Sequence, residues 1–204
     1  MMTTQLPEDL QLDNDFWQFS LSIWQNKKTQ ETLLRLQDTK YLRVNLLLFS
    51  MWLGIERKSI DHHILTVLEA TEHWHQQVVG PLRSVRKTLP LQPPASKLKP
   101  QVQHSELLAE QIEQSLLYKC AHNIPAKTPP HNQPDNTLSI LIKNLLACTS
   151  HAQSIQQLNN VESRLKKKVD TLNPSDLLLL AQACLPKHPA SHISACIESI
   201  TLSQ

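Results

Sequence analysis

Residues 44–55 read VNLLLFSMWLGI and form the longest apolar stretch of the chain. Asn45, Ser50 and Gly54 interrupt the stretch, and it is well short of the roughly 18 apolar residues that a membrane-spanning helix needs. An apolar segment of this kind is typical of a helix buried inside a soluble protein. We therefore expect residues 44–55 to form the central helix of the core, with Asn45 beginning or capping it.

Helical patterns flank this segment on both sides. Before it, we expect a first helix capped by Asp13 or Asn14, with apolar residues at mixed spacings of three and four, and a shorter helix over Gln30–Asp38. After it, Ser59 begins a longer helix with a helical period of apolar residues. Pro81 must kink or restart that helix, because proline cannot donate a backbone hydrogen bond.

Eight of the thirteen prolines fall within residues 89–103 and 124–136. We expect the first stretch to be an extended linker. Ser105 then caps a helix with an apolar stripe through Leu108, Ile112, Leu116 and Cys120. The second stretch is a further break in the helical pattern. The predicted organisation is an N-terminal helical bundle over 12–122, a proline-rich connector over 123–136 and a C-terminal helical region over 137–204, separate or docked as one domain.

Composition excludes several classes of protein. Gly54 and Gly80 are the only glycines, so the glycine loops that hold phosphates are absent and tight hairpins are disfavoured. The four cysteines form no Cys-x-x-Cys pair, and the polar first eleven residues do not resemble a secretory signal, which favours a reducing, cytoplasmic location. The expected fold class is all-α: a multi-helix bundle with proline-rich connectors and a C-terminal helical extension.

Three sequence blocks occur in the first third of the chain: FWQFS at 16–20, LQD at 36–38 and VNLLLF at 44–49. In this order and spacing they resemble an uncharacterised proteobacterial family of unknown function. The resemblance implies a bacterial, cytosolic, helical protein and carries over no catalytic residues. The chain departs from the family pattern by lacking Pro-Gly after the first helix and by having Tyr41 where a glycine is usual. These two loops are therefore expected to differ in shape.

Polar side chains lie beside the apolar runs at Gln37, Asp38 and Asn45. Two interpretations remain open. These residues cap helices and satisfy buried backbone groups, or they line a small pocket beside the aromatic residues of the first core.

Histidine and carboxylate side chains crowd residues 61–75. On a helix, His62, Glu69 and His73 fall within about 40° of one another, on the face opposite the apolar residues. We expect this face to be solvated, because metal sites in helical bundles need ligands that point inward. Glu72-x-x-His75 matches half of a di-iron motif, but the chain has no second copy of that motif.

A second pattern of metal-ligand types lies near the C-terminus, at Cys184, His188, His192 and Cys196. On one continuous helix the outer two residues would be about 18 Å apart, but two prolines break the helix and allow the four to converge on zinc. Both cysteines also lie beside apolar residues, as buried structural thiols do. No other metal or cofactor is predicted.

Basic residues gather in two segments, which contain Arg83, Arg86 and Lys87, and Arg164, Lys166, Lys167 and Lys168. The first segment belongs to a stretch from Pro81 to His104 without an acidic residue. A net charge of +2 and the absence of a recognisable recognition helix argue against nucleic acid as a partner. A solvated basic surface is the ordinary interpretation.

The leading hypothesis is a non-enzymatic cytosolic interaction or adaptor protein, since no motif places a nucleophile beside a base. Its unknown partner, or a second copy in a homodimer, would meet the basic linker or a narrow heptad-like seam at Ile155, Leu158, Leu165, Val169 and Leu172. One alternative is a small enzyme or ligand-binding bundle with a pocket near Asp38 and Asn45. Another is a weak nucleic-acid binder that uses segments 83–99 and 164–168.

Overall fold

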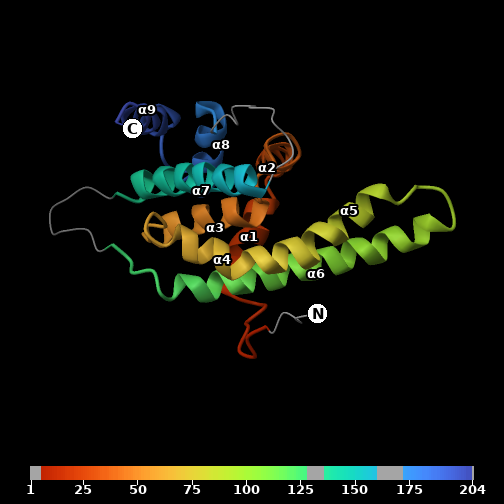
Figure 1. Cartoon of the computed structure of the whole chain (residues 1–204). Coiled ribbons are helices and arrows are strands. Elements are labelled where there is room, and N and C mark those ends of the chain that lie inside the picture. Colours follow the sequence, from red (N-terminus) through yellow and green to blue (C-terminus); the bar gives the residue numbers. More distant parts are fainter. Residues whose placement is uncertain (1–5, 128–135, 160–171, 204) are drawn as a thin grey trace.

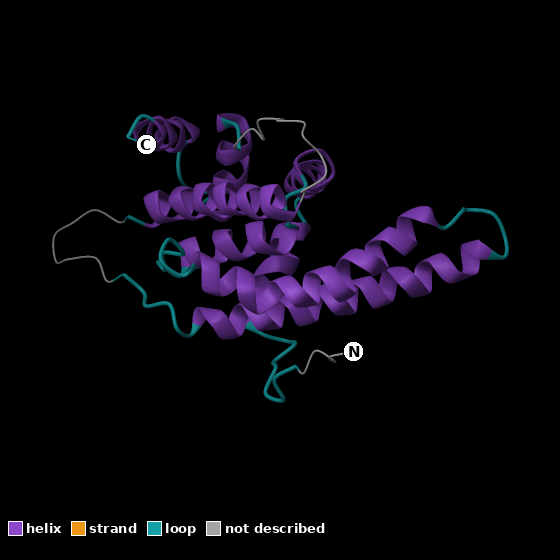
Figure 2. Ribbon diagram, viewed as in Figure 1, coloured by secondary structure: helices purple, strands orange, loops and turns teal. Residues whose placement is uncertain are grey.

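The computed structural model describes residues 6–127, 136–159 and 172–203, with residues 151–159 described by their backbone alone. Every regular element in these ranges is helical (Figures 1 and 2), so the all-α prediction is confirmed. In chain order the helices are α1 (Asp15–Trp24), α2 (Lys27–Lys40), α3 (Val44–Ile55), α4 (Ile64–Trp74), the π-helical segment η1 (His75–Val79), α5 (Gly80–Thr88), α6 (Ala95–Ala121), α7 (Thr137–Asn159), α8 (Pro174–Cys184) and α9 (Ala190–Thr201). Among the described helices, none combines the length and hydrophobicity needed to cross a bilayer.

Helix α3 forms the centre of the core, as predicted. All of its residues from Val44 to Gly54 are buried, because α1, α2, α6, α7 and α8 contact it. Arg43 occupies the N-cap position. Asn45 therefore lies in the first turn and does not cap the helix, and its amide is available for contacts with another element.

The closest helix pair is α3 with α7. A Cβ atom added to Gly54 would lie 2.6 Å from the Cα atom of Leu141 and 2.7 Å from its Cβ atom. No side chain fits at such a distance, so glycine is required for the two backbones to approach this closely.

Helices α1 and α2 begin at asparagine caps. The Oδ1 atom of Asn14 accepts a hydrogen bond of 2.9 Å from the Trp17 amide, which confirms one of the two predicted caps. Asn26 caps α2, which extends beyond the predicted helix at both ends. Tyr41 ends α2 in the left-handed conformation with φ of 55°. Glycine is the usual residue in that conformation, because it has no Cβ atom.

The chain from α4 through η1 to α5 is one continuous helical rod. The predicted start at Ser59 is wrong, because residues 59–63 form a turn and α4 begins at Ile64. Pro81 neither ends nor restarts the rod. The π-helical segment precedes it, and the Gly80 amide donates to the His75 carbonyl oxygen, five residues back. The wider π-helical turn accommodates a residue that cannot make the regular α-helical bond.

Helices α5 and α6 lie side by side and form an arm that projects from the remaining helices (Figure 1). The extended linker predicted over 89–103 is wrong, because the turn ends at Pro94 and α6 begins at Ala95. Pro100 lies in the second turn of α6, where the missing N–H removes one backbone hydrogen bond and the contact with α5 compensates. Ser105 lies inside α6 and does not cap it.

The C-terminal helices complete the same hydrophobic core. Buried residues of α7, α8 and α9 belong to one cluster with those of α1 to α4. Asn173 caps α8 by accepting from the Asp176 amide at 2.8 Å, and Arg35 of α2 forms an ion pair with Asp176. Of the predicted seam, Leu172 has a described side chain and is buried. The other four seam side chains lie outside the described residues.

The contact between α3 and α7 predicts the effect of Gly54→Ala. The added methyl group must push Leu141 away, so we expect the free energy of unfolding to fall by about 1–3 kcal/mol despite the better helix propensity of alanine. Urea denaturation followed by circular dichroism measures this change.

Gly80→Ala is the matched control, because the methyl group there would meet one atom, the His75 carbonyl oxygen, at 3.3 Å. We expect this variant to differ from wild type by less than about 1 kcal/mol. Equal stability losses in the two variants would contradict the close contact of α3 with α7.

Candidate ligand-binding groove

A buried carboxylate, Glu113 of α6, lies at the polar centre of the molecule. Its side chain is 1% exposed. The predicted apolar stripe of this helix is wrong at its first residue, because Leu108 is 43% exposed. The buried face of α6 instead carries polar residues among apolar ones, namely Glu106, Ala109, Glu113, Gln114, Ser115, Leu116, Leu117 and Ala121.

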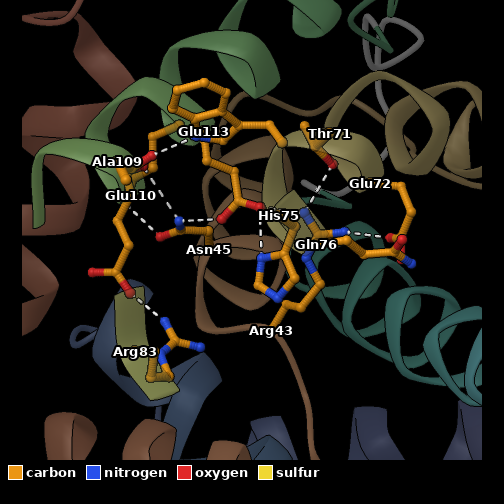
Figure 3. A network of polar contacts seen from close by, with 12 residues as sticks. Arg43, Asn45, Thr71, Glu72, His75, Gln76, Arg83, Ala109, Glu110 and Glu113 are labelled. Carbon is orange, nitrogen blue, oxygen red and sulfur yellow. Dashed lines mark hydrogen bonds and ion pairs between the residues drawn. The ribbon is translucent and has the colours of Figure 1, made fainter. Parts of the chain in front are cut away.

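Glu113 receives contacts from three residues (Figure 3). The guanidinium of Arg43, which precedes α3, forms an ion pair with Oε1. The Nδ1 atom of His75, the first residue of η1, lies 2.9 Å from the same oxygen. The Nδ2 atom of Asn45 donates to Oε2 at 2.6 Å. Arg43 also bonds to Glu72 at 3.0 Å, so one cation joins α3, α4 and α6.

The three glutamates of this part of α6 differ in their affinity for protons. Burial raises the pKa of Glu113, but Arg43 and then His75 and Asn45 outweigh burial and hold the pKa at about 2. For Glu106, the ion pairs with the Arg86 and Arg83 guanidinium groups outweigh burial and lower the pKa.

Glu110 differs from both neighbours. Burial is the largest effect and raises the pKa of Glu110 above its ordinary value, and the charge of Glu106 adds to this effect. An ion pair with Arg83 offsets only part of the increase (Figure 3). Of the three carboxyls, Glu110 is therefore the one with a partly uncompensated negative charge.

A groove of about 440 Å³ opens beside these carboxylates, between α1, α2, α3 and the two helices of the arm. Its apolar walls contain Trp17, Leu21, Trp24, Leu34, Leu48 and Leu107. Its buried polar residues include Asn45 and Gln114, which are 6% and 3% exposed. Glu110 lies beside them, so the polar groups gather at one part of an otherwise apolar surface.

Two features distinguish the groove from an ordinary protein surface. Three leucines in its walls remain exposed: Leu21 by 42%, Leu34 by 39% and Leu107 by 50%. Gln114 donates from Nε2 to the Asn45 Oδ1 atom at 2.9 Å, but its own Oε1 atom is buried without a hydrogen-bond partner. A buried acceptor without a partner carries a free-energy cost that a bound donor would remove.

The structure brings two of the three predicted pocket residues to this groove. Gln37 and Asn45 both line it. Asp38 does not, because its carboxylate forms an exposed ion pair of 2.7 Å with Lys87 of α5. The capping interpretation of Asn45 is wrong, since its side chain bonds to α6.

The first basic segment is neutralised within the molecule. Arg83 forms ion pairs with Glu106 and Glu110, and Arg86 pairs with Glu106, although no acidic residue is near them in sequence. Contact of these arginines with phosphate would require the ion pairs to break. The second segment, with Arg164, Lys166, Lys167 and Lys168, lies outside the described residues.

The side chains that the sequence offers as metal ligands do not lie together in the described structure. Nowhere in the described parts of the chain do three His, Cys, Asp or Glu side chains lie close enough to share an ion. His62, Glu69 and His73 are exposed, as predicted for a solvated face, whereas Glu72 and His75 join the network around Arg43 and Glu113.

The four C-terminal residues likewise do not converge. The rings of His188 and His192 stack with centroids 5.9 Å apart, and Cys184 and Cys196 pack against the hydrophobic core. Burial raises the pKa of Cys184 to about 12, which disfavours the thiolate that zinc binds.

Glu113 predicts a specific pH dependence. Glu113→Gln removes the buried partner of Arg43 and leaves it with Glu72 alone, so we expect the free energy of unfolding at pH 7 to fall by about 3 kcal/mol. Because the folded pKa of about 2 lies below the ordinary value of 4.5, ionised Glu113 stabilises the fold above pH 4.5 and loses this effect toward pH 2. The stability difference between wild type and variant should therefore shrink over that interval in urea titrations.

Glu69→Gln, on the exposed face of α4, is the matched control. It should change stability by less than about 0.5 kcal/mol at every pH. A Glu113→Gln protein as stable as wild type at pH 7 would show that the buried ion pair has no structural role.

The segment that builds the groove is also the segment shared with other proteins. A family model described as protein of unknown function (DUF2390) matches residues 15–117, which include every residue that lines the groove and the network around Glu113. No curated protein and no solved structure matches the chain significantly. The resemblance to an uncharacterised family is confirmed. Because the match covers half of the 204 residues, the chain belongs to the DUF2390 family of proteins of unknown function.

Proposed function

We propose that the protein is a non-enzymatic helical binding protein whose groove takes a small amphipathic ligand. The observation that carries this proposal is the combination of exposed leucines in the walls with an unpaired, buried acceptor at Gln114. An apolar cavity with a few convergent polar groups and a perturbed carboxyl is the usual form of a ligand site.

The size and composition of the groove support a ligand of modest size. Its volume of about 440 Å³ falls within the range of roughly 300–1,000 Å³ that is common for such sites. Leu21, Leu34 and Leu107 come from three different helices, yet they gather around one cavity. Exposed leucines that stand alone need no explanation, whereas a group around a cavity indicates a surface that a bound molecule would cover.

The groove supports binding more than catalysis. Ser20 lines it, but the Ser20 Oγ atom donates to the Phe16 carbonyl oxygen at 2.9 Å and so is not activated by a base. Glu110 is a proton donor or acceptor without a neighbouring nucleophile in the lining. A binding role therefore accounts for the residues better than nucleophilic chemistry does.

An interaction or adaptor role is the second candidate, and the far end of the arm favours it. Leu91 is 74% exposed and Leu98 is 46% exposed at this end, and Lys97 lies exposed beside them in sequence. Such a basic and apolar tip on a projecting arm suits contact with an acidic partner protein. Nucleic acid is less favoured, since Arg83 and Arg86 are already paired with glutamates.

Binding of decan-1-ol, followed by tryptophan fluorescence, tests the proposal, because Trp17 and Trp24 line the groove. The double variant Leu21→Asp and Leu34→Asp places two carboxylates in the apolar walls. We expect its affinity for the alcohol to fall by about tenfold or more, since each leucine contributes about 1.5 kcal/mol or more of buried apolar surface.

Leu65→Asp is the control, because Leu65 is a 61% exposed leucine of α4 outside the lining of the groove. It should bind the alcohol as wild type does. The proposal fails if wild type binds no decan-1-ol, or if the double variant and the control lose affinity equally.

A further inference from the structure

We propose that the groove selects ligands with a protonated amine, held between Glu110 and Gln114, and an apolar body that lies against Trp17 and Trp24. This inference rests on the proposed function and adds the chemical class of the ligand. It derives from a count of hydrogen-bond donors and acceptors at the polar part of the groove.

The side-chain amide donors at this place are already used. Asn45 Nδ2 donates to Glu113 and, at 3.3 Å, to the Glu110 carbonyl oxygen. Gln114 Nε2 donates to the Asn45 Oδ1 atom. The guanidinium groups of Arg83 and Arg86 contact carboxylates of α6. A ligand that offers only acceptors, such as a carboxylate, would find no free amide donor here and would compete with Glu106 and Glu110 for the two arginines.

The acceptors are not all used. The buried Oε1 atom of Gln114 has no partner, and the same side chain lines the groove. An N–H group of a ligand that reaches this buried atom would satisfy it, and Nε2 could keep its bond to Asn45. Complementarity at the polar part of the groove therefore requires a donor on the ligand.

The charges favour a cationic donor over a neutral one. The charged groups that interact with Glu110 are Arg83, Arg86, Glu106 and Glu113. Glu113 has Arg43 and His75 as partners, and Glu106 has both Arg83 and Arg86. Glu110 shares only Arg83, and it accepts that ion pair at Oε1. An ammonium group beside Glu110 would supply the missing positive charge.

The affinity of the groove for an amine should also depend on pH. Because burial raises the pKa of Glu110, this carboxyl takes up a proton at a higher pH than an exposed glutamate does. Binding of an ammonium ion favours the carboxylate, and the proton passes to solvent. Affinity for the amine must therefore rise with pH as Glu110 ionises, provided that the amine, with a pKa near that of lysine at about 10.4, stays protonated.

Calorimetric titration with three ligands that share one apolar chain tests the inference: decan-1-amine, decan-1-ol and decanoate, each below its micelle concentration. We expect wild type to bind the amine about tenfold or more tightly than the alcohol, and the carboxylate most weakly. Glu110→Gln should bind amine and alcohol with similar affinity, and its affinity for the amine should no longer rise with pH. Asp38→Asn removes the same charge at a residue outside the lining and should keep both properties.

The outcomes separate the two proposals. If wild type binds all three ligands equally, or prefers decanoate, the amine inference is overturned and the groove remains a ligand site. If none of the three binds, the proposed function fails as well. Should Glu110→Gln not fold, as judged by its circular dichroism, the order of the three ligands and the pH dependence in wild type decide the matter alone.

Discussion

Burial of one ionised carboxylate is the constraint on which the arrangement of α3, α4 and α6 depends. Moving a charge from water into a protein interior costs several kcal/mol unless other groups replace the lost hydration. For Glu113 the replacements are Arg43, His75 and Asn45, which come from the start of α3 and from η1. Since each contact tolerates only small displacements, these elements are fixed relative to α6 by the requirements of one side chain.

The π-helical segment explains how a single rod serves two different surfaces. A π-helical turn holds one more residue than an α-helical turn. The side chains after it are therefore rotated by about 100° around the helix axis compared with a regular α-helix. Before the turn, α4 buries Val67, Leu68 and Thr71 in the core. After the turn, Arg83 and Arg86 of α5 meet the glutamates of α6 and line the groove. The irregular turn thus brings His75 to Glu113 and the two arginines to the groove.

The parts of the fold that depend on local sequence could be predicted. The central helix of residues 44–55 follows from a run of apolar residues, and the caps at Asn14 and Asn173 follow from side chains that bond two or three residues onward. The linker over 89–103 could not, because the contact between α5 and α6 outweighs the local effect of Pro100. Local rules describe what a segment does when no neighbouring helix stabilises another conformation.

The candidate site was only partly predictable for a related reason. Asn45 and Gln37 attract attention as polar residues beside apolar runs, and both line the groove. Glu113 gives no such signal, because a glutamate inside a polar-looking helix is ordinarily exposed. Its partner Arg43 is separated from it by 70 residues, so neither residue indicates the pairing without knowledge of how α3 and α6 pack.

The groove and the C-terminal helices serve separate physical roles. Every described lining residue lies between Trp17 and Gln114, whereas the described side chains of α7, α8 and α9 contribute none. Helix α7 instead covers the side of α3 where Gly54 meets Leu141, and α8 and α9 pack against α7 and extend the hydrophobic core. Ligand selection should therefore depend on the segment that defines the family, and the C-terminal helices should affect it only through the stability and position of α3. The position of α3 matters because Asn45, in its first turn, connects the buried carboxylate Glu113 to Gln114.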